Sequence, residues 1–413
     1  MTDIEGRHRT VAVRTSWRDK WRRVQELGLY GAGPLAIFIT APVLAQGLGP
    51  DARGDFGVAQ AVVSFAAAVG ACGQAEVYLA DRREGSGNYR AAARVALLGA
   101  VVTSLLAVAV MLALRLDFAL SLAAAVLVPV ITQSQLWRSA AVSLGRIALP
   151  AYSSAMAAAL RVLALSALWW AAVLNATSAM AAVQMTTALA GAIVLGRMVR
   201  RPGSVVSVPS SRGQYQVLLR RGAPLLLFSV LTSITLRSDI LAVQMFASSE
   251  QVGVYAAASS LSISVLAISG AFKSRVQAAL FGDDARAGLR LEMRIIAFLV
   301  VPAGVLASVG SPWIVQILFG PGYGDAVSVL RILSFAAVAL VFLDVAHAAV
   351  VVLGLRRQLI GVAAVGAGVS VVALVALVPA FGADGAALAS LLGYSAGAVT
   401  GWLCVRKALA DDR

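Results

Sequence analysis

The sequence predicts an all-α polytopic membrane protein in which about twelve transmembrane helices form two parallel six-helix lobes. Three observations lead to this prediction: the composition, the spacing of apolar runs and a repeat between the two halves. The chain is 60% hydrophobic and 13% charged, with a mean hydropathy of +0.84. Soluble domains carry about 25% charged residues, so this composition is typical of a chain that lies mostly in lipid.

The apolar runs set the number of helices. Runs of about 20 residues recur from end to end, and each is long enough to cross a hydrocarbon core of roughly 30 Å as a helix. We therefore expect twelve spans, at residues 27–49, 56–80, 95–114, 118–137, 149–172, 178–196, 222–246, 252–272, 295–318, 326–353, 359–378 and 385–405.

Basic residues orient these spans, because Lys and Arg are enriched in cytoplasmic loops. With the N-terminus in the cytoplasm, 29 of the 34 basic residues fall in cytoplasmic segments. Only Arg53 and Arg115 fall in outer loops, and three more arginines lie within spans. Both termini are therefore predicted to be cytoplasmic. The net charge of +14 is spread over these short segments, which suits contact with anionic membrane lipids and not with nucleic acid.

The longest cytoplasmic connection divides the spans six and six. It reads RMVRRPGSVVSVPSSRGQYQVLLRR and is rich in Pro, Gly and Ser, as linkers are. The expected organisation is a basic cytoplasmic N-terminal segment (1–26), an N-terminal six-helix lobe (27–196), a cytoplasmic linker (197–221), a C-terminal six-helix lobe (222–405) and a cytoplasmic tail (406–413).

A repeat relates the two lobes. GDFGVAQA at 54–61 opens the second span, and EQVGVYAA at 250–257 opens the eighth. AAVSLGR at 140–146 ends the fourth span, and AVVVLGLR at 349–356 ends the tenth. These positions indicate duplication of a six-helix unit in parallel orientation, a build used by secondary transporters whose substrate site lies between the repeats near the middle of the membrane.

Four stretches in order carry a resemblance to a known family. They are LGPDARGDFGVAQA (48–61), RSDILAVQMFASSEQVGVYAAASSL (237–261), LFGPGYGDAVSVLRILS (318–334) followed by VVLGLRRQLIG (351–361), and PAFGADGAALASLLGY (379–394). Together they resemble the polysaccharide transporter (lipid-linked oligosaccharide flippase) family of the MOP superfamily, which also contains the multidrug MATE exporters. The resemblance implies that the two six-helix lobes surround a central cavity and work by alternating access. It also implies the flipping of polyprenyl-pyrophosphate-linked oligosaccharide across the bacterial inner membrane. It also implies partners among the proteins of cell-surface polysaccharide biosynthesis.

Arginines inside the spans are the candidate substrate contacts. A charge at the centre of a span costs about 2.5–3.5 kcal/mol on insertion scales, so it normally faces protein or water. Arg161, Arg237 and Arg331 are predicted to bind the substrate's diphosphate, because a guanidinium donates two parallel hydrogen bonds to one phosphate. The structural alternative is that an acidic residue neutralises each arginine and fixes helix packing. Arg331 also lies close enough to the outer interface to snorkel.

Five other polar residues are candidates for lining the cavity or for coupling. Asp239 stands two residues after Arg237, about 200° around a helix, so the two cannot pair on one face. Asp344 and His347 share a face at i and i+3, where they form either a proton-carrying pair or a buried hydrogen-bonded one. The remaining candidates are Glu76 and Gln244.

Helix-breaking residues mark the first span as a candidate gate. GAGPLAIFITAPVLAQGLG at 31–49 contains Pro34 and Pro42 among several glycines, and proline removes a helical hydrogen bond. We predict that the helix bends at these prolines during transport. The alternative is an irregular, tightly packed helix.

The chain shows no Walker loop, no paired carboxylates in an outer loop and no metal-ligand spacing. We therefore expect a transporter with no enzymatic activity, cofactor or metal, and no disulfide between Cys72 and Cys404. A cation-coupled MATE-type drug exporter remains an alternative, although it would favour acidic residues in the cavity. A polyprenyl-linked sugar polymerase or glycosyltransferase is a further alternative, but outer loops of seven residues or fewer leave little room for its active site.

Overall fold

The computed structural model describes residues 17–83, 88–144, 148–199, 212–280 and 284–411. Within these ranges the chain is helical and contains no strand, which confirms the predicted all-α class. The helices are α1 (Trp17–Gly70), α2 (Gln74–Arg83), α3 (Tyr89–Ala113), α4 (Phe118–Ala125), α5 (Val128–Ser143), α6 (Ala148–Trp170), α7 (Ala176–Val199), α8 (Arg212–Phe246), α9 (Ser249–Leu280), α10 (Ala285–Val309), α11 (Ser311–Leu318), α12 (Ala326–Val352) and α13 (Arg356–Asp411).

Most of these helices are long and apolar enough to cross a membrane. Nine stretches of the described residues meet that criterion of length and composition. Seven of them hold one predicted span each, and two, Leu35–Gly70 and Arg356–Ala410, hold two each. The remaining predicted span lies in α9, which is rich in serine and is not among the nine. The fold is therefore that of a multi-span membrane protein.

Two predicted outer loops are wrong in detail. Residues 50–55 are helical and follow a kink at Gly49, and residues 379–384 are helical except at Gly382. Helices α1 and α13 therefore each contain two predicted spans. Gly49 has φ 72° and ψ 172°, and Gly382 has φ 54° and ψ −128°. Side chains with a Cβ are strained at positive φ, whereas glycine is not. A single glycine therefore replaces each predicted loop.

Other predicted boundaries also change. The span predicted at 56–80 is interrupted at residues 71–73, where Cys72 and Gly73 have positive φ. The spans predicted at 118–137 and 295–318 are each split into two helices. Helix α8 begins at Arg212 and so includes the end of the predicted linker, whereas linker residues 200–211 lie outside the described ranges.

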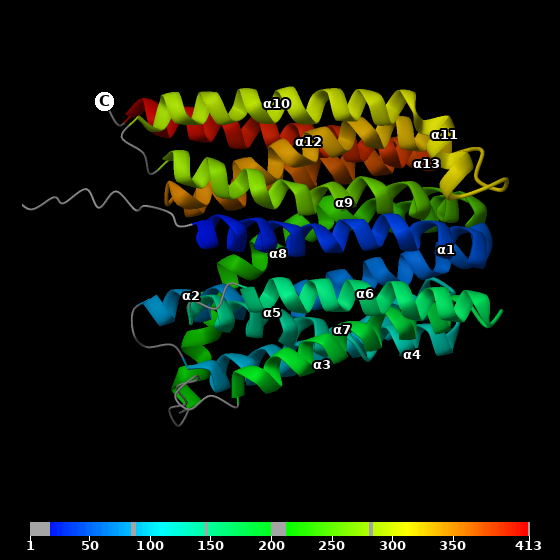
Figure 1. Ribbon diagram of the computed structural model, residues 1–413, viewed down its shortest axis with the longest axis horizontal. Coiled ribbons are helices and arrows are strands. Elements are labelled where there is room, and N and C mark those ends of the chain that lie inside the picture. The colour runs from blue at the N-terminus through cyan, green and yellow to red at the C-terminus, as the bar shows by residue number, and fades with distance from the viewer. Residues whose placement is uncertain (1–16, 84–87, 145–147, 200–211, 281–283, 412–413) are drawn as a thin grey trace, which may run out of the picture.

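The helices form two groups side by side (Figure 1). Helices α2–α7 lie on one side and α9–α13 on the other, with α1 and α8 running between them. We call α1–α7 the N-terminal half and α8–α13 the C-terminal half. Helix α1 begins and α13 ends at the same end of the molecule, which we call the terminal end. The opposite end, where α1 and α13 turn at Gly49 and Gly382, is called the far end.

The core is continuous between the halves. Buried residues of α1, including Ala59 and Val63, belong to the same cluster as Tyr255 and Ala258 of α9. Alanine, valine and leucine make up most of this cluster. Small side chains let helix backbones approach closely, which is how helices associate in lipid without a hydrophobic driving force. The cavity described next interrupts this packing.

Candidate functional site

A cavity of about 120 Å³, here called the central cavity, lies between the two halves. Helices α1, α6 and α7 of the N-terminal half and α8 and α9 of the C-terminal half provide its walls. Its polar lining residues are Thr40, Arg53, Gln60, Arg161, Arg237, Asp239, Ser259 and Ser260. The structure therefore brings together Arg161, Arg237 and Asp239, three of the residues that the sequence predicts for a substrate site.

The three arginines of the cavity hold few hydrogen bonds. Arg161 donates one from Nη2 to Thr187 Oγ1 at 3.4 Å, and its Nε is buried without a partner in the described part of the chain. Arg237 is half-buried, and it has no hydrogen bond or ion pair to any described residue. Arg53 is almost fully buried and keeps two N–H groups free of described partners. Most of the donor capacity of these guanidiniums is thus open to a ligand.

Asp239 provides the carboxylate that lines the central cavity, and it accepts hydrogen bonds from two hydroxyl groups. Tyr255 of α9 donates to Asp239 Oδ2 at 2.5 Å, and Ser390 of α13 donates to the same oxygen at 3.1 Å. The backbone N–H of Ile240 donates to Oδ1 at 2.8 Å. Asp239 therefore ties α8 to α9 and α13, and the lining has three guanidiniums against one carboxylate.

Several predicted site residues lie outside the central cavity. Arg331 is exposed, and its Nε donates to Ser311 Oγ at 3.2 Å. Glu76 is exposed in the first turn of α2. Gln244 donates to the carbonyl oxygen of Leu114 at 3.3 Å and so links α8 to the segment after α3. The geometry gives these three residues no place in the lining, and the prediction that Arg331 binds diphosphate gains no support.

Asp344 and His347 lie together in a second pocket, within the C-terminal half. Lys273 of α9 forms an ion pair with Asp344 at 2.7 Å, and Ser269 donates a short hydrogen bond to the same carboxylate. The His347 ring packs edge-on against Phe228 at 5.2 Å between centroids, and its Nε2 is buried without a described partner. Asp344 thus pairs with Lys273 and not with an arginine of the central cavity.

The predicted gate residues lie in a regular helix. Helix α1 passes through Pro34 and Pro42, and its non-helical backbone angles are at Gly49. Pro42 is half-buried, and the adjacent Ala41 lines the central cavity. Bending at these prolines during transport stays a prediction.

Sequence reasoning missed Arg53 and Lys273 as site residues. Arg53 was assigned to an outer loop, yet it is 3% exposed and lines the central cavity. The sequence did contain one indication of its role. Arg53 is one of only two basic residues predicted on the outer side, where Lys and Arg are normally depleted. Lys273 was assigned to a cytoplasmic segment because α9 extends beyond the predicted end of its span.

The two halves also contact each other at the far end. This far-end contact joins residues 50–57 of α1 to residues 249–256 of α9. A Cβ added at Gly253 would overlap the carbonyl oxygen of Pro50, and one at Gly54 would lie 3.0 Å from the Gly253 nitrogen. The Tyr323 hydroxyl adds a hydrogen bond of 3.0 Å to the Ala45 carbonyl of α1. The backbones therefore meet almost directly.

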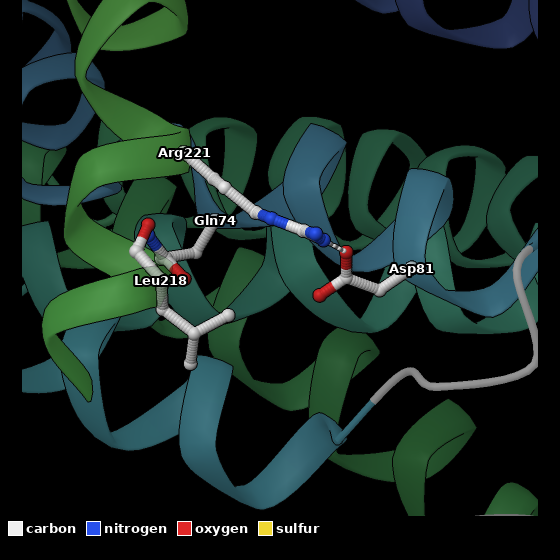
Figure 2. A network of polar contacts seen from close by, with 4 residues as sticks. All are labelled: Gln74, Asp81, Leu218 and Arg221. Carbon is white, nitrogen blue, oxygen red and sulfur yellow. Dashed lines mark hydrogen bonds and ion pairs between the residues drawn. The ribbon is translucent and has the colours of Figure 1, made fainter. Parts of the chain in front are cut away.

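A second contact between the halves lies toward the terminal end. This terminal-end contact joins α2 to the start of α8 (Figure 2). Arg221 of α8 reaches toward α2 and forms an ion pair of 2.6 Å with Asp81 (Figure 2). Gln74 donates to the Leu218 carbonyl at 3.2 Å, and a Cβ added at Gly222 would overlap the Cys72 carbonyl oxygen.

This arrangement suits an anionic ligand. Guanidinium groups that face a dehydrated cavity bind phosphate through parallel, charge-assisted N–H bonds. Within the described residues, no group of three His, Cys, Asp or Glu side chains is placed to hold a metal ion. Two helical halves around a central cavity define the class of the protein: it has the fold of a secondary membrane transporter.

Solved structures share this fold. The chain is similar to an inward-facing multidrug-resistance MATE family transporter of the MOP superfamily, with a TM-score of 0.72 at 16% identity over 92% of this chain and 95% of that one. The outward-facing conformation of such a transporter gives a TM-score of 0.63 at 14% identity over 94% and 95%. A MOP superfamily transporter from Pyrococcus furiosus, described as having a binding pocket of reverse polarity, gives 0.64 at 16% identity over 94% and 96%.

A family model described as polysaccharide biosynthesis protein matches residues 43–328. The match covers more than half of the chain, so the chain belongs to this polysaccharide biosynthesis family. No curated protein matches the sequence. The resemblance inferred from the four sequence stretches is therefore confirmed at the level of the family and of the MOP fold.

Proposed function

We propose that this protein flips polyprenyl-pyrophosphate-linked oligosaccharide across the bacterial inner membrane by alternating access, with both termini in the cytoplasm. The observation that carries the proposal is the charge of the central cavity, where Arg53, Arg161 and Arg237 face one carboxylate. That carboxylate, Asp239, is already hydrogen-bonded to two hydroxyl groups and to its neighbouring backbone N–H. The cavity therefore attracts an anion of more than one negative charge, such as a diphosphate.

The family assignment supports the nature of the cargo. A polysaccharide biosynthesis protein that spans the membrane is placed to move sugars toward the cell surface. The sugars of the proposed cargo are linked to lipid through a diphosphate, and the cationic cavity would bind that group. Alternating access is supported by the two-half architecture, since parallel repeats of this kind rock about a shared site.

A MATE-type drug exporter is the second candidate, and the likeness to solved MATE transporters supports it. Cationic drugs require acidic groups in the binding cavity, whereas three arginines would repel them. The two candidate functions therefore differ in the sign of the charge on the ligand.

Binding of farnesyl diphosphate, a short isoprenyl diphosphate, tests the proposal. The protein in lipid nanodiscs is titrated by calorimetry with farnesyl diphosphate, with uncharged farnesol and with the cation tetraphenylphosphonium. We expect saturable binding of the diphosphate alone. Arg161→Ala and Arg237→Ala should each weaken it by about tenfold or more, since hydrogen bonds to charged groups contribute about 1.5–3 kcal/mol. Arg237→Lys should retain part of the affinity, because the charge survives while the planar fork does not.

Two controls make this test decisive. Arg115→Gln removes an exposed arginine of the segment after α3 and should leave binding unchanged. Asp239→Asn combined with Arg237→Ala separates binding from packing, because a purely structural Arg237 would leave a stranded acid whose neutralisation restores the protein. Restored accumulation and transport in that double variant, or preferential binding of tetraphenylphosphonium, would overturn the proposal.

A further inference from the structure

Arg53 stands where the central cavity meets the far-end contact. Its side chain lines the cavity and is 3% exposed. Its Nη2 donates a hydrogen bond of 3.2 Å to the carbonyl oxygen of Ala256, which belongs to α9 of the other half. The guanidinium also lies over the Phe56 ring, 5.3 Å from its centroid. Arg53 thus belongs both to the ligand cavity and to the junction of the halves.

The remaining N–H groups of Arg53 are unused. Its Nε and Nη1 atoms are buried and have no hydrogen-bond partner within the described residues. A buried N–H of a charged group without an acceptor costs free energy, because it has lost its water without replacement. An acceptor that enters the cavity would therefore be bound strongly by this side chain.

Resting on the proposed function, we infer that Arg53 is the phosphate-binding group through which an occupied cavity releases the far-end contact. A diphosphate in the cavity accepts two parallel N–H bonds from the guanidinium. As the guanidinium turns toward the diphosphate, its bond to the Ala256 carbonyl is lost. That carbonyl lies within helix α9 and keeps its helical amide partner, so the release leaves no acceptor without a donor.

This arrangement meets the thermodynamic condition for coupling ligand binding in the central cavity to opening of the far-end contact. A ligand shifts an equilibrium between two states only through a difference in its affinity for them. Arg53 provides the difference, because with the far end closed one of its donors is held by Ala256. With the far end open, all five of its N–H donors face the ligand. Among the described residues Arg161 donates to Thr187 of its own half and to no residue of the other, so its affinity for the ligand should not differ between the two states.

The test measures the distance across the far end. Nitroxide labels at cysteines introduced for Trp170 and Phe381, which are 91% and 60% exposed, report on the N-terminal and C-terminal halves. The native Cys72 and Cys404 are replaced, and the distance distribution is recorded in nanodiscs by pulsed electron paramagnetic resonance. Farnesyl diphosphate, inorganic pyrophosphate and farnesol are added separately. We expect farnesyl diphosphate and pyrophosphate to lengthen the distance, and farnesol to leave it unchanged.

The informative variant is Arg53→Gln. The glycine approach of α1 and α9 and the Tyr323 hydrogen bond remain, so the far end stays closed without ligand. Glutamine carries no charge for the phosphate, so farnesyl diphosphate binds through Arg161 and Arg237 with about tenfold lower affinity and no longer lengthens the distance. Arg53→Lys keeps the charge and should retain part of the response. Arg115→Gln, outside the cavity, should respond as the unmodified protein does.

The outcomes separate this inference from the proposed function. If the unmodified protein binds farnesyl diphosphate but the distance does not change, the inference fails and the proposed function stands. If Arg53→Gln, saturated with ligand, opens as fully as the unmodified protein, the inference fails in the same way. If the unmodified protein does not bind the diphosphate at all, both fail. Size-exclusion profiles of the variants, compared with Arg53→Lys, exclude misfolding as the cause of a lost response.

Discussion

The far-end contact and the terminal-end contact join the same two halves by different means. At the far end, glycines of α1 and α9 let the backbones meet, and hydrogen bonds run from Arg53 and Tyr323 to carbonyl groups. At the terminal end the backbones also approach closely, at Gly73 and Gly222. There the Asp81–Arg221 ion pair and the hydrogen bond from the Gln74 amide add to the contact (Figure 2).

This difference should make only the terminal-end contact sensitive to salt. Backbone contacts at glycine depend on shape, so they tolerate salt but not an added methyl group. The ion pair of the terminal-end contact, whose Arg221 side chain is half-exposed, is screened by salt. Both contacts should therefore respond to substitution of their glycines, and only the terminal-end contact should also respond to salt.

The largest expected effect is that of Gly253→Ala. The new Cβ would overlap the Pro50 carbonyl oxygen, and no change of rotamer relieves a clash between backbones. Overpacking of this kind costs about 1–3 kcal/mol or more. We expect a strong loss of folded protein in the membrane, measured by fluorescence-detected size exclusion.

Gly270→Ala is the matched control for this substitution. Gly270 lies on the same helix, and a Cβ there meets nothing within 4 Å. Because alanine is the better helix former, this variant should accumulate at least as well as the unmodified protein. Equal behaviour of the two alanine variants would contradict the role assigned to backbone approach at the far end.

A smaller effect is expected from Tyr323→Phe. The change removes the hydrogen bond to the Ala45 carbonyl, and a typical hydrogen bond contributes about 0.5–1.5 kcal/mol. We expect a lower thermal midpoint and a longer far-end distance, whereas Tyr152→Phe on the exposed face of α6 should change neither.

Tyr323 also sets the pH range of the far-end contact. Burial raises the pKa of Tyr323 to about 12, although the charge of Arg53 opposes the shift. An unfolded tyrosine titrates near pH 10. Because the folded pKa is the higher one, the stabilisation is complete below about pH 10 and is lost as the pH rises through about 12. A midpoint that falls between pH 7 and 9 in the unmodified protein but not in Tyr323→Phe would contradict this.

The smallest effect is expected from Arg221→Ala. The side chains of Arg221 and Asp81 are 53% and 12% exposed, and ion pairs this accessible contribute about 0–1 kcal/mol. The difference from the unmodified protein should shrink further in 0.5 M salt. Exchanging the charges, with Arg221→Asp and Asp81→Arg together, should restore the low-salt midpoint. A large loss for Arg221→Ala that persists at high salt would show that the two contacts are alike.

The sequence predicted the helical spans well because lipid imposes a simple requirement. A chain in hydrocarbon must satisfy its own backbone hydrogen bonds, so each long apolar run is helical. The same reasoning placed loops at 50–55 and 379–384, where a single glycine with positive φ makes the turn. Hydropathy does not report backbone dihedral angles, so these turns could not be located from it.

The site was predicted in part, for a related reason. Arg161 and Arg237 stood out because a charge within a span needs a polar neighbour. The partners of Asp239 and Asp344 did not, because Tyr255, Ser390 and Lys273 come from distant helices and their proximity depends on packing. Arg53 was misassigned because nothing in its local sequence shows that this turn of α1 is covered by α9.

The far-end contact also bears on the origin of the chain. The two stretches that mark the internal repeat, GDFGVAQA at 54–61 and EQVGVYAA at 250–257, are the ones that pack against each other there. If the halves arose by duplication, as the repeat indicates, a six-helix ancestor with this stretch would have met its own copy across a twofold axis, as isologous dimers do. Because the two stretches contact each other, a substitution in one changes the packing of the other. We therefore expect substitutions to be tolerated when both stretches change together and not when one changes alone.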